Sequence, residues 1–138
     1  MSELFGAMTI SANGMKAQGE RVRVISENVA NAATAPLSPE QEPYRRKVIT
    51  FKNVMDKSQG VNLVKVDNIK EDTKSEFIKK YMPHHPGAGE NGYVNMPNIN
   101  TLIEMTDMKE AHRSYQANLG MIQKTKSMAM STIDLLRN

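Results

Sequence analysis

The sequence has no cysteine, no tryptophan and few aromatic residues, which make up 5% of its 138 residues. The lack of cysteine excludes a disulfide framework, thiol catalysis and a zinc–thiolate site. No apolar run approaches the roughly 20 residues that a membrane-spanning helix needs. The first residues also lack the basic start and continuous apolar stretch of a secretory signal. We therefore predict a chain that does not span a membrane and that, if exported, carries no cleaved signal.

The composition favours helices that pack on other helices. The chain contains 11 methionines, whose flexible side chains adapt to partner surfaces, whereas a dense core relies on aromatic anchors. Its 18 basic and 15 acidic residues interleave along the sequence and give a formal net charge of +3. Nucleic-acid-binding proteins gather their basic charge on one face. The isoelectric point of about 9.2 is therefore weak evidence for a nucleic-acid partner.

Residues 1–35 form the first predicted segment, a helix from about Leu4 to Ala33 that Pro36 brings to an end. Its apolar side chains recur at the heptad spacing of a coiled coil: Met8, Met15, Val22, Ile25 and Val29. Three glycines in this stretch each weaken an isolated helix by about 1 kcal/mol relative to alanine. We expect this helix to depend on a partner.

Residues 98–138 form the second predicted helix, with Thr101 and Glu104 as a capping box and Asn98 or Asn100 as alternative caps. Its predicted apolar stripe consists of Met105, Met108, Tyr115, Leu119, Ile122, Ala129, Ile133 and Leu136. The two helices would be about 45 and 52 Å long at 1.5 Å per residue, which allows them to lie side by side. A pair alone leaves part of each stripe uncovered, so we expect partner subunits.

The middle region, residues 36–97, contains all six prolines. β-Branched residues predict strands at 44–52 and 61–66, joined as a hairpin near Gly60. Residues 71–82 fit either a strand or a short helix, and residues 83–92 have turn chemistry. The predicted fold is therefore mainly α and elongated. Its N- and C-terminal helices are paired in a coiled-coil-like tube domain, and the middle segment is small, irregular and contains a β-hairpin.

Three of the asparagines in the predicted helices, Asn28, Asn31 and Asn118, stand out because asparagine is a middling helix former. Asn31 lies at a helix end, where a left-handed conformation would terminate the helix. Asn28 and Asn118 lie further inside. A polar amide on or beside an apolar stripe fixes helix alignment and partner number at some cost in stability. We predict that Asn28 and Asn118 specify one alignment among many similar ones.

Residues that could carry chemistry form no recognised site. His84 and His85 are adjacent on a proline-flanked loop and His112 is on the second helix, so converging metal ligands are not supported. The glycine-rich stretch 87–92 lacks the strand, helix and lysine of a phosphate-binding loop. We predict no enzymatic activity, no catalytic residue, no metal, no cofactor and no small-molecule substrate.

The stretch Tyr44–Lys52 is the strongest basic and aromatic cluster. In a strand its basic side chains would alternate between both faces, which is a poor platform for single-stranded nucleic acid. A charged edge strand is the favoured interpretation. We therefore predict no nucleic-acid partner. Retention on heparin in high salt would revive that rival interpretation, because phosphate contacts weaken steeply with salt.

Four stretches together carry a resemblance to a known family. They are SENVANA (Ser26–Ala32) in the first helix, RSYQANLGMI (Arg113–Ile122) in the second, and PYRRKVITF (Pro43–Phe51) and HPGAGENGYVNMPNIN (His85–Asn100) in the middle. The chain resembles the bacterial flagellar axial proteins, the rod, hook and hook-associated subunits. Within that family its middle region is similar to that of the proximal rod proteins.

The resemblance implies a structural subunit of the periplasmic flagellar rod that transmits torque from the motor to the hook. It implies export through the flagellar type III apparatus without a cleaved signal peptide, and terminal helices that form the inner tube of a helical assembly. The implied partners are copies of the same chain, other rod subunits and the basal adaptor protein next to the export gate. Another type III-exported helical protein, such as a needle or translocator component, is the alternative.

The residues predicted to make protein contacts come from both helices. They are Met8, Met15, Val22, Ile25, Asn28, Val29, Asn31, Met108, Tyr115, Asn118, Leu119 and Ile122.

Overall fold

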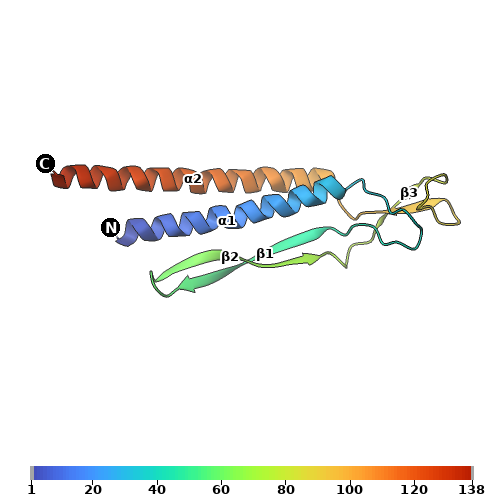
Figure 1. Cartoon of the computed structure of the whole chain (residues 1–138), viewed down its shortest axis with the longest axis horizontal. Coiled ribbons are helices and arrows are strands. Elements are labelled where there is room, and N and C mark those ends of the chain that lie inside the picture. The colour runs from blue at the N-terminus through green and yellow to red at the C-terminus, as the bar shows by residue number, and fades with distance from the viewer. Residues whose placement is uncertain (1, 138) are drawn as a thin grey trace. The chain divides into compact units, whose positions relative to one another are not determined.

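The computed structural model of the protein describes residues 2–137, and in that range it contains two long helices and four strands (Figure 1). In chain order these are α1 (Ser2–Asn31), β1 (Lys47–Asp56), β2 (Val61–Glu71), β3 (Ile78–Tyr81), β4 (Tyr93–Met96) and α2 (Thr101–Arg137). The strands form two two-stranded sheets, β1–β2 and β3–β4. The predicted fold class is confirmed, because two terminal helices pack together and the middle region holds short strand pairs.

The cap of α2 differs from the predicted capping box. The side-chain oxygen of Asn100 accepts hydrogen bonds from the backbone N–H groups of Leu102 at 3.0 Å and Ile103 at 3.4 Å. Asn100 is therefore the N-cap. The Thr101–Glu104 capping box is wrong because the Glu104 carboxylate is turned toward Asn28 and Arg46.

The end of α1 also differs from the prediction. Among the described residues, only glycines have a positive φ, so Asn31 does not adopt the left-handed conformation. Its amide instead donates to the backbone oxygen of Glu27 at 2.9 Å, within the last helical turn. The left-handed interpretation of Asn31 was wrong, because this hydrogen bond keeps the residue in the helix.

The middle region follows the predicted hairpin and adds a second one. β1 and β2 overlap the strands predicted at 44–52 and 61–66, and the turn between them closes with a Gly60 N–H to Asp56 oxygen bond of 2.8 Å. The undecided segment 71–82 contains the strand β3. β3 pairs antiparallel with β4, with Ile78 opposite Met96 and Tyr81 opposite Tyr93. The sequence did not predict β4, which is only four residues long.

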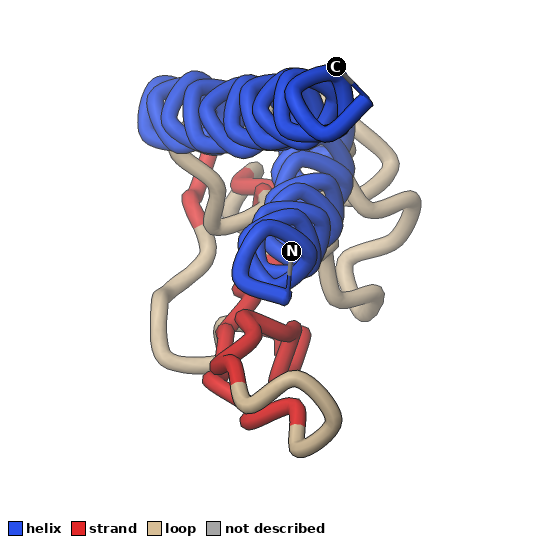
Figure 2. Tube along the Cα trace, turned by 90° about the vertical axis from the view of Figure 1, so that its left-hand side faces the viewer, coloured by secondary structure: helices blue, strands red, loops and turns tan. Residues whose placement is uncertain are grey.

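The chain divides into two compact units. Unit 1 consists of the segment up to Val22, Thr50–Asn68 and the segment from Lys109 onward; unit 2 consists of Arg23–Ile49 and Ile69–Met108. Within unit 1, α1 lies between α2 and the β1–β2 hairpin (Figures 1 and 2). The buried side chains there are small or medium in size: Ser11, Ala17, Leu63, Ala111 and Thr125.

In unit 1, the close approach of α1 to α2 depends on Gly14. A Cβ added at Gly14 of α1 would lie only 2.8 Å from the side-chain nitrogen of Asn118 on α2. Arg21, seven residues after Gly14 on α1, forms an ion pair at 3.6 Å with Glu110. Glu110 lies eight residues before Asn118 on α2. These two contacts fix an antiparallel alignment of the two helices in unit 1.

The core of unit 2 combines apolar and polar side chains. Val24, Ile25, Val94, Pro97 and Ile99 are buried. Asn28 and Glu104 are each 1% exposed and belong to the same core. In the part of the chain that the structure describes, no helix is long and apolar enough to span a membrane.

Candidate functional site

The buried stripe of α2 is more polar than the predicted one. Its positions alternate steps of four and three residues, which places them on one helix face. They are Glu104, Met108, Ala111, Tyr115, Asn118, Ile122, Thr125 and Ala129. Met105 and Leu119 are each one residue away from this stripe and are 52% and 38% exposed. The prediction followed the larger apolar side chains, whereas small and polar ones face α1 where the helices approach closely.

The predicted contact residues mostly lie in the helix packing. Ile25 and Asn28 are buried and Leu119 is exposed. The others are partly buried: Met8, Met15, Val22, Val29, Asn31, Met108, Tyr115, Asn118 and Ile122. Their contacts with other subunits stay a prediction.

Asn28 is the centre of a polar network in unit 2. Its amide nitrogen donates to the Lys47 backbone oxygen at 2.9 Å and to Glu104 Oε2 at 3.1 Å. Its amide oxygen accepts from the Lys47 N–H at 2.9 Å and from the Tyr44 hydroxyl at 3.0 Å. The side chain thus ties α1 to the start of β1 and to α2. We define the polar network as Asn28, Tyr44, Arg46, Lys47 and Glu104.

Glu104 supplies the buried charge of this network. Arg46 Nε donates to Glu104 Oε1, and the other end of the guanidinium lies 3.8 Å from Asp107. The backbone N–H of Arg46 donates to the Asn98 side chain at 2.9 Å, which holds the arginine at the start of α2. A buried carboxylate is stable only when paired and hydrogen-bonded. Both carboxylate oxygens of Glu104 have such partners.

The electrostatics of the network bear most clearly on Tyr44. Burial of the hydroxyl, followed by the negative charges of Glu27, Glu104 and Glu71, raises the pKa of Tyr44 to about 12. The hydroxyl therefore stays protonated and continues to donate to Asn28 well above neutral pH.

The sequence predicted a structural role for Asn28 but did not predict its hydrogen-bond partners. Glu104 lies 76 residues away and was assigned to helix capping, and Arg46 was assigned to a charged edge strand. Within the chain, the Asn118 amide donates to the Ser114 oxygen at 3.0 Å and lies against Gly14. Its role in specifying helix alignment stays a prediction.

A second apolar stripe runs along the uncovered side of α2. Met121, Met128 and Leu135 recur at seven-residue steps and are 54%, 54% and 79% exposed. We call these three residues the outer stripe. Heptad spacing places them on a common face, and each is offset from the buried stripe. Large apolar side chains in such a row are typical of a surface that another helix covers.

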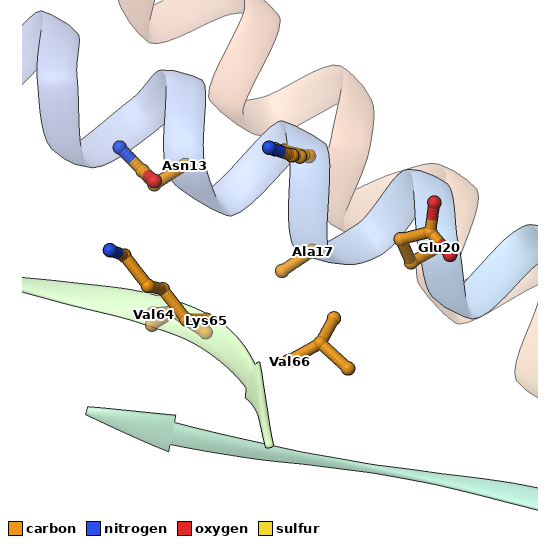
Figure 3. A pocket seen from close by; sticks show the side chains of 7 residues that line it. Asn13, Ala17, Glu20, Val64, Lys65 and Val66 are labelled. Atoms are coloured by element: carbon orange, nitrogen blue, oxygen red, sulfur yellow. The ribbon is translucent and has the colours of Figure 1, made fainter. Parts of the chain in front are cut away.

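A groove lies between α1 and β2 in unit 1 (Figure 3). It has a volume of about 420 Å³ and is lined by Asn13, Lys16, Ala17, Glu20, Val64, Lys65 and Val66. Figure 3 shows Ala17 and Val66 pointing toward one another across it, with Glu20 at its rim. We call it the α1–β2 groove.

His85 takes part in a turn of the loop between β3 and β4. The Nδ1 atom of His85 accepts the backbone N–H of Gly87 at 3.0 Å and so closes a turn. Among residues 2–137, no group of three or more histidine, aspartate or glutamate side chains is arranged to hold a metal ion.

Comparison with known proteins identifies relatives over almost the whole chain. A family model described as flagellar basal body rod FlgEFG protein C-terminal matches residues 90–135. The chain is 46% identical over 137 residues to the flagellar basal-body rod protein FlgC of Agrobacterium fabrum, with 99% of this chain and 98% of the relative covered. It is 36% identical to the protein of the same name from Salmonella typhimurium over 132 residues, covering 96% and 97%. The Borreliella burgdorferi protein of that name is also 36% identical, over 152 residues, covering 97% and 98%.

Proposed function

This chain belongs to the FlgC family of flagellar basal-body rod proteins and is a structural subunit of that rod; on this premise we propose that it joins its neighbours through its two terminal helices. In this proposal the α1–α2 pair is the assembly element. The middle region braces it through the polar network. The full-length relatives do not favour the alternative of a needle or translocator component.

The outer stripe is the observation that carries the proposal. Covering Met121, Met128 and Leu135 with a neighbouring helix would remove three large side chains from water, at about 25 cal/mol for each Å² of apolar surface. The buried stripe already holds α2 on α1 within the chain. The outer stripe is therefore left for contacts between subunits.

The same arrangement supports torque transmission. A helical array needs interfaces in which each subunit presents different faces to different neighbours, because identical faces would close into a dimer. α2 offers distinct faces, one buried on α1 and one carrying the outer stripe. A buried polar network also resists sliding of α1 along α2, since any shift would separate Asn28 from Glu104.

Location and partners follow from the family. The chain is part of the flagellar basal body and associates with other rod components. The proposal places it in the periplasmic rod, exported through the flagellar type III apparatus without a cleaved signal. Its neighbours there are further copies, other rod subunits and the adaptor protein next to the export gate. It needs no cofactor and catalyses no reaction.

A single charge in the outer stripe tests the proposal. Met128→Glu should leave the helical content of the purified chain unchanged, because Met128 is exposed. The variant should be depleted from isolated basal bodies and should fail to restore swimming. Ser127→Glu adds the same charge at the neighbouring exposed position on another face of α2 and serves as the control. Normal incorporation and swimming of Met128→Glu would refute assembly through the outer stripe.

A further inference from the structure

In the described part of the chain, α2 extends past the start of α1. Gly14 packs against Asn118, and the helices are antiparallel, so Ser2 at the start of α1 lies opposite about residue 130 in the same register. Residues 131–137 extend past that point, and every one of them is exposed. Leu135 and Leu136 are 79% and 83% exposed, the two highest values among the exposed large apolar side chains. We call residues 131–137 the overhang.

One face of the overhang, extended by Met130 just before it, combines apolar and charged side chains. Met130, Ile133, Asp134 and Arg137 follow the spacing i, i+3, i+4, i+7, which places them together on a helix surface. Met130 and Ile133 are about half exposed. The face therefore presents two apolar anchors beside one acidic and one basic side chain.

The α1–β2 groove has matching chemistry. Its lining contains three apolar side chains, Ala17, Val64 and Val66, together with two lysines, Lys16 and Lys65, and one acid, Glu20. Figure 3 shows the Lys65 side chain rising from β2 toward Asn13, along the groove. An amphipathic helix that lays apolar side chains into a groove of this kind is a recurring recognition mode.

The groove cannot receive the overhang of its own chain. Ala17 lies opposite residue 115 in the register set by Gly14 and Asn118. Asp134 is 19 residues further along α2, which corresponds to roughly 28 Å at 1.5 Å per residue. A continuous helix cannot fold back over that distance. The occupant must come from another molecule.

We propose that the overhang of one copy docks in the α1–β2 groove of a second copy, with Ile133 and the preceding Met130 against the apolar lining and Asp134 beside Lys16 and Lys65. Arg137 then lies on the side of Glu20. The contact is heterologous, because the groove and the overhang are different surfaces, and it can therefore repeat from copy to copy. This inference rests on the proposed function, since it requires copies that sit side by side.

The absence of native cysteine makes the contact directly testable. In cells that make only the variant chain, Val64→Cys combined with Ile133→Cys should form disulfides between copies when isolated basal bodies are oxidised. A disulfide requires Cβ atoms about 3.5–4.5 Å apart, so it reports close contact. The control pairs Val64→Cys with Ser131→Cys, which lies two residues from Ile133 and nearly opposite on the helix. We expect about tenfold more covalent dimer from the first pair than from the control.

The outcomes separate this inference from the proposed function. If the variant chain is present in basal bodies but neither pair forms dimers, the overhang does not occupy the groove, while assembly through the helices stands. If the overhang cross-links to a different rod protein, the second-copy assignment is overturned. If neither cysteine variant is incorporated into basal bodies, the charge variants described next test the same contact.

Reversing the charges gives an independent test without cysteine. Asp134→Lys and Lys65→Glu should each lower the amount of chain in basal bodies, because like charges would face each other across the contact. The combination of both substitutions should restore incorporation. Lys57→Glu on the β1–β2 turn makes the same charge change as Lys65→Glu and should have no effect. Wild-type incorporation of both single variants, or failure of the combined variant to recover, would overturn the docking.

Discussion

At the scale of single residues, the stability of unit 2 depends on a charge in its core. Glu104 is 1% exposed and accepts hydrogen bonds from Asn28 and Arg46, which come from α1 and from the residues just before β1. Such a network is stable when every member is satisfied and costly when one is removed. It joins three segments that are distant in sequence, so it can form only when all three are in place.

Removing the carboxylate should therefore be strongly destabilising. Glu104→Ala leaves the Asn28 amide and the Arg46 guanidinium without their acceptor, and we expect the free energy of unfolding to fall by about 3 kcal/mol or more. Chemical denaturation of the purified chain measures this change. Glu110→Ala, which breaks the more exposed pair with Arg21, should lower it by no more than about 0.5 kcal/mol. Equal effects of the two substitutions would contradict a structural role for the buried charge.

The loss of folding stability at alkaline pH should be due to ionisation of Tyr44. Its pKa is about 12 in the folded chain against 10.0 for the unperturbed group, so the folded state retains a proton that the unfolded state loses. This contribution is complete below pH 10 and declines as pH rises from 10 to 12.

Tyr44→Phe should remove that alkaline decline, whereas Tyr81→Phe at an exposed position should keep it. Denaturation midpoints across this pH range, together with absorbance titration of the tyrosinates, provide the measurement. A Tyr44→Phe chain that still loses stability as steeply as the parent would show that other groups are responsible.

At the scale of elements, the helices and the first hairpin could be predicted because each is encoded locally. Heptad spacing and Pro36 delimit α1, and β-branched residues mark β1 and β2. The buried face of α2 could not be predicted, because methionines and leucines occur on several of its faces and size does not reveal which one meets α1. Nor could the partners of Asn28, which depend on tertiary contacts 19 and 76 residues away.

Two glycines of α1 separate local helix preference from packing between elements. A Cβ at Gly19 would meet no atom within 4 Å, whereas one at Gly14 would lie 2.8 Å from Asn118. Gly19→Ala should raise the free energy of unfolding by up to about 1 kcal/mol, because alanine is the better helix former. Gly14→Ala should lose that gain to the clash with Asn118.

Thermal unfolding of the two variants compares them directly. Shortening the opposing side chain in the combined variant Gly14→Ala with Asn118→Ala should recover stability relative to Gly14→Ala alone. If Gly14→Ala proves as stabilising as Gly19→Ala, the close approach of α1 and α2 at this point is not a constraint.

At the scale of the whole molecule, protection should be uneven along the chain before assembly. The overhang is exposed throughout and extends past the described start of α1, whereas Val24, Asn28 and Glu104 are buried. Helix ends without tertiary contacts open at little cost, while core amides exchange only through larger unfolding. We expect amides of residues 131–137 in the isolated chain to exchange with solvent at least about a hundredfold faster than those of residues 104–118.

Assembly should then change the two regions differently. Once the chain is in basal bodies, the overhang should become protected because another copy covers it, while residues 104–118 of α2 should change little. Hydrogen exchange measured by mass spectrometry on both samples provides the comparison, and the amides of Glu104–Asn118 serve as the internal reference. If the overhang is already protected from exchange in the isolated chain, the end of α2 is stable without a neighbouring subunit. An overhang that stays exposed in basal bodies would leave it outside every subunit contact.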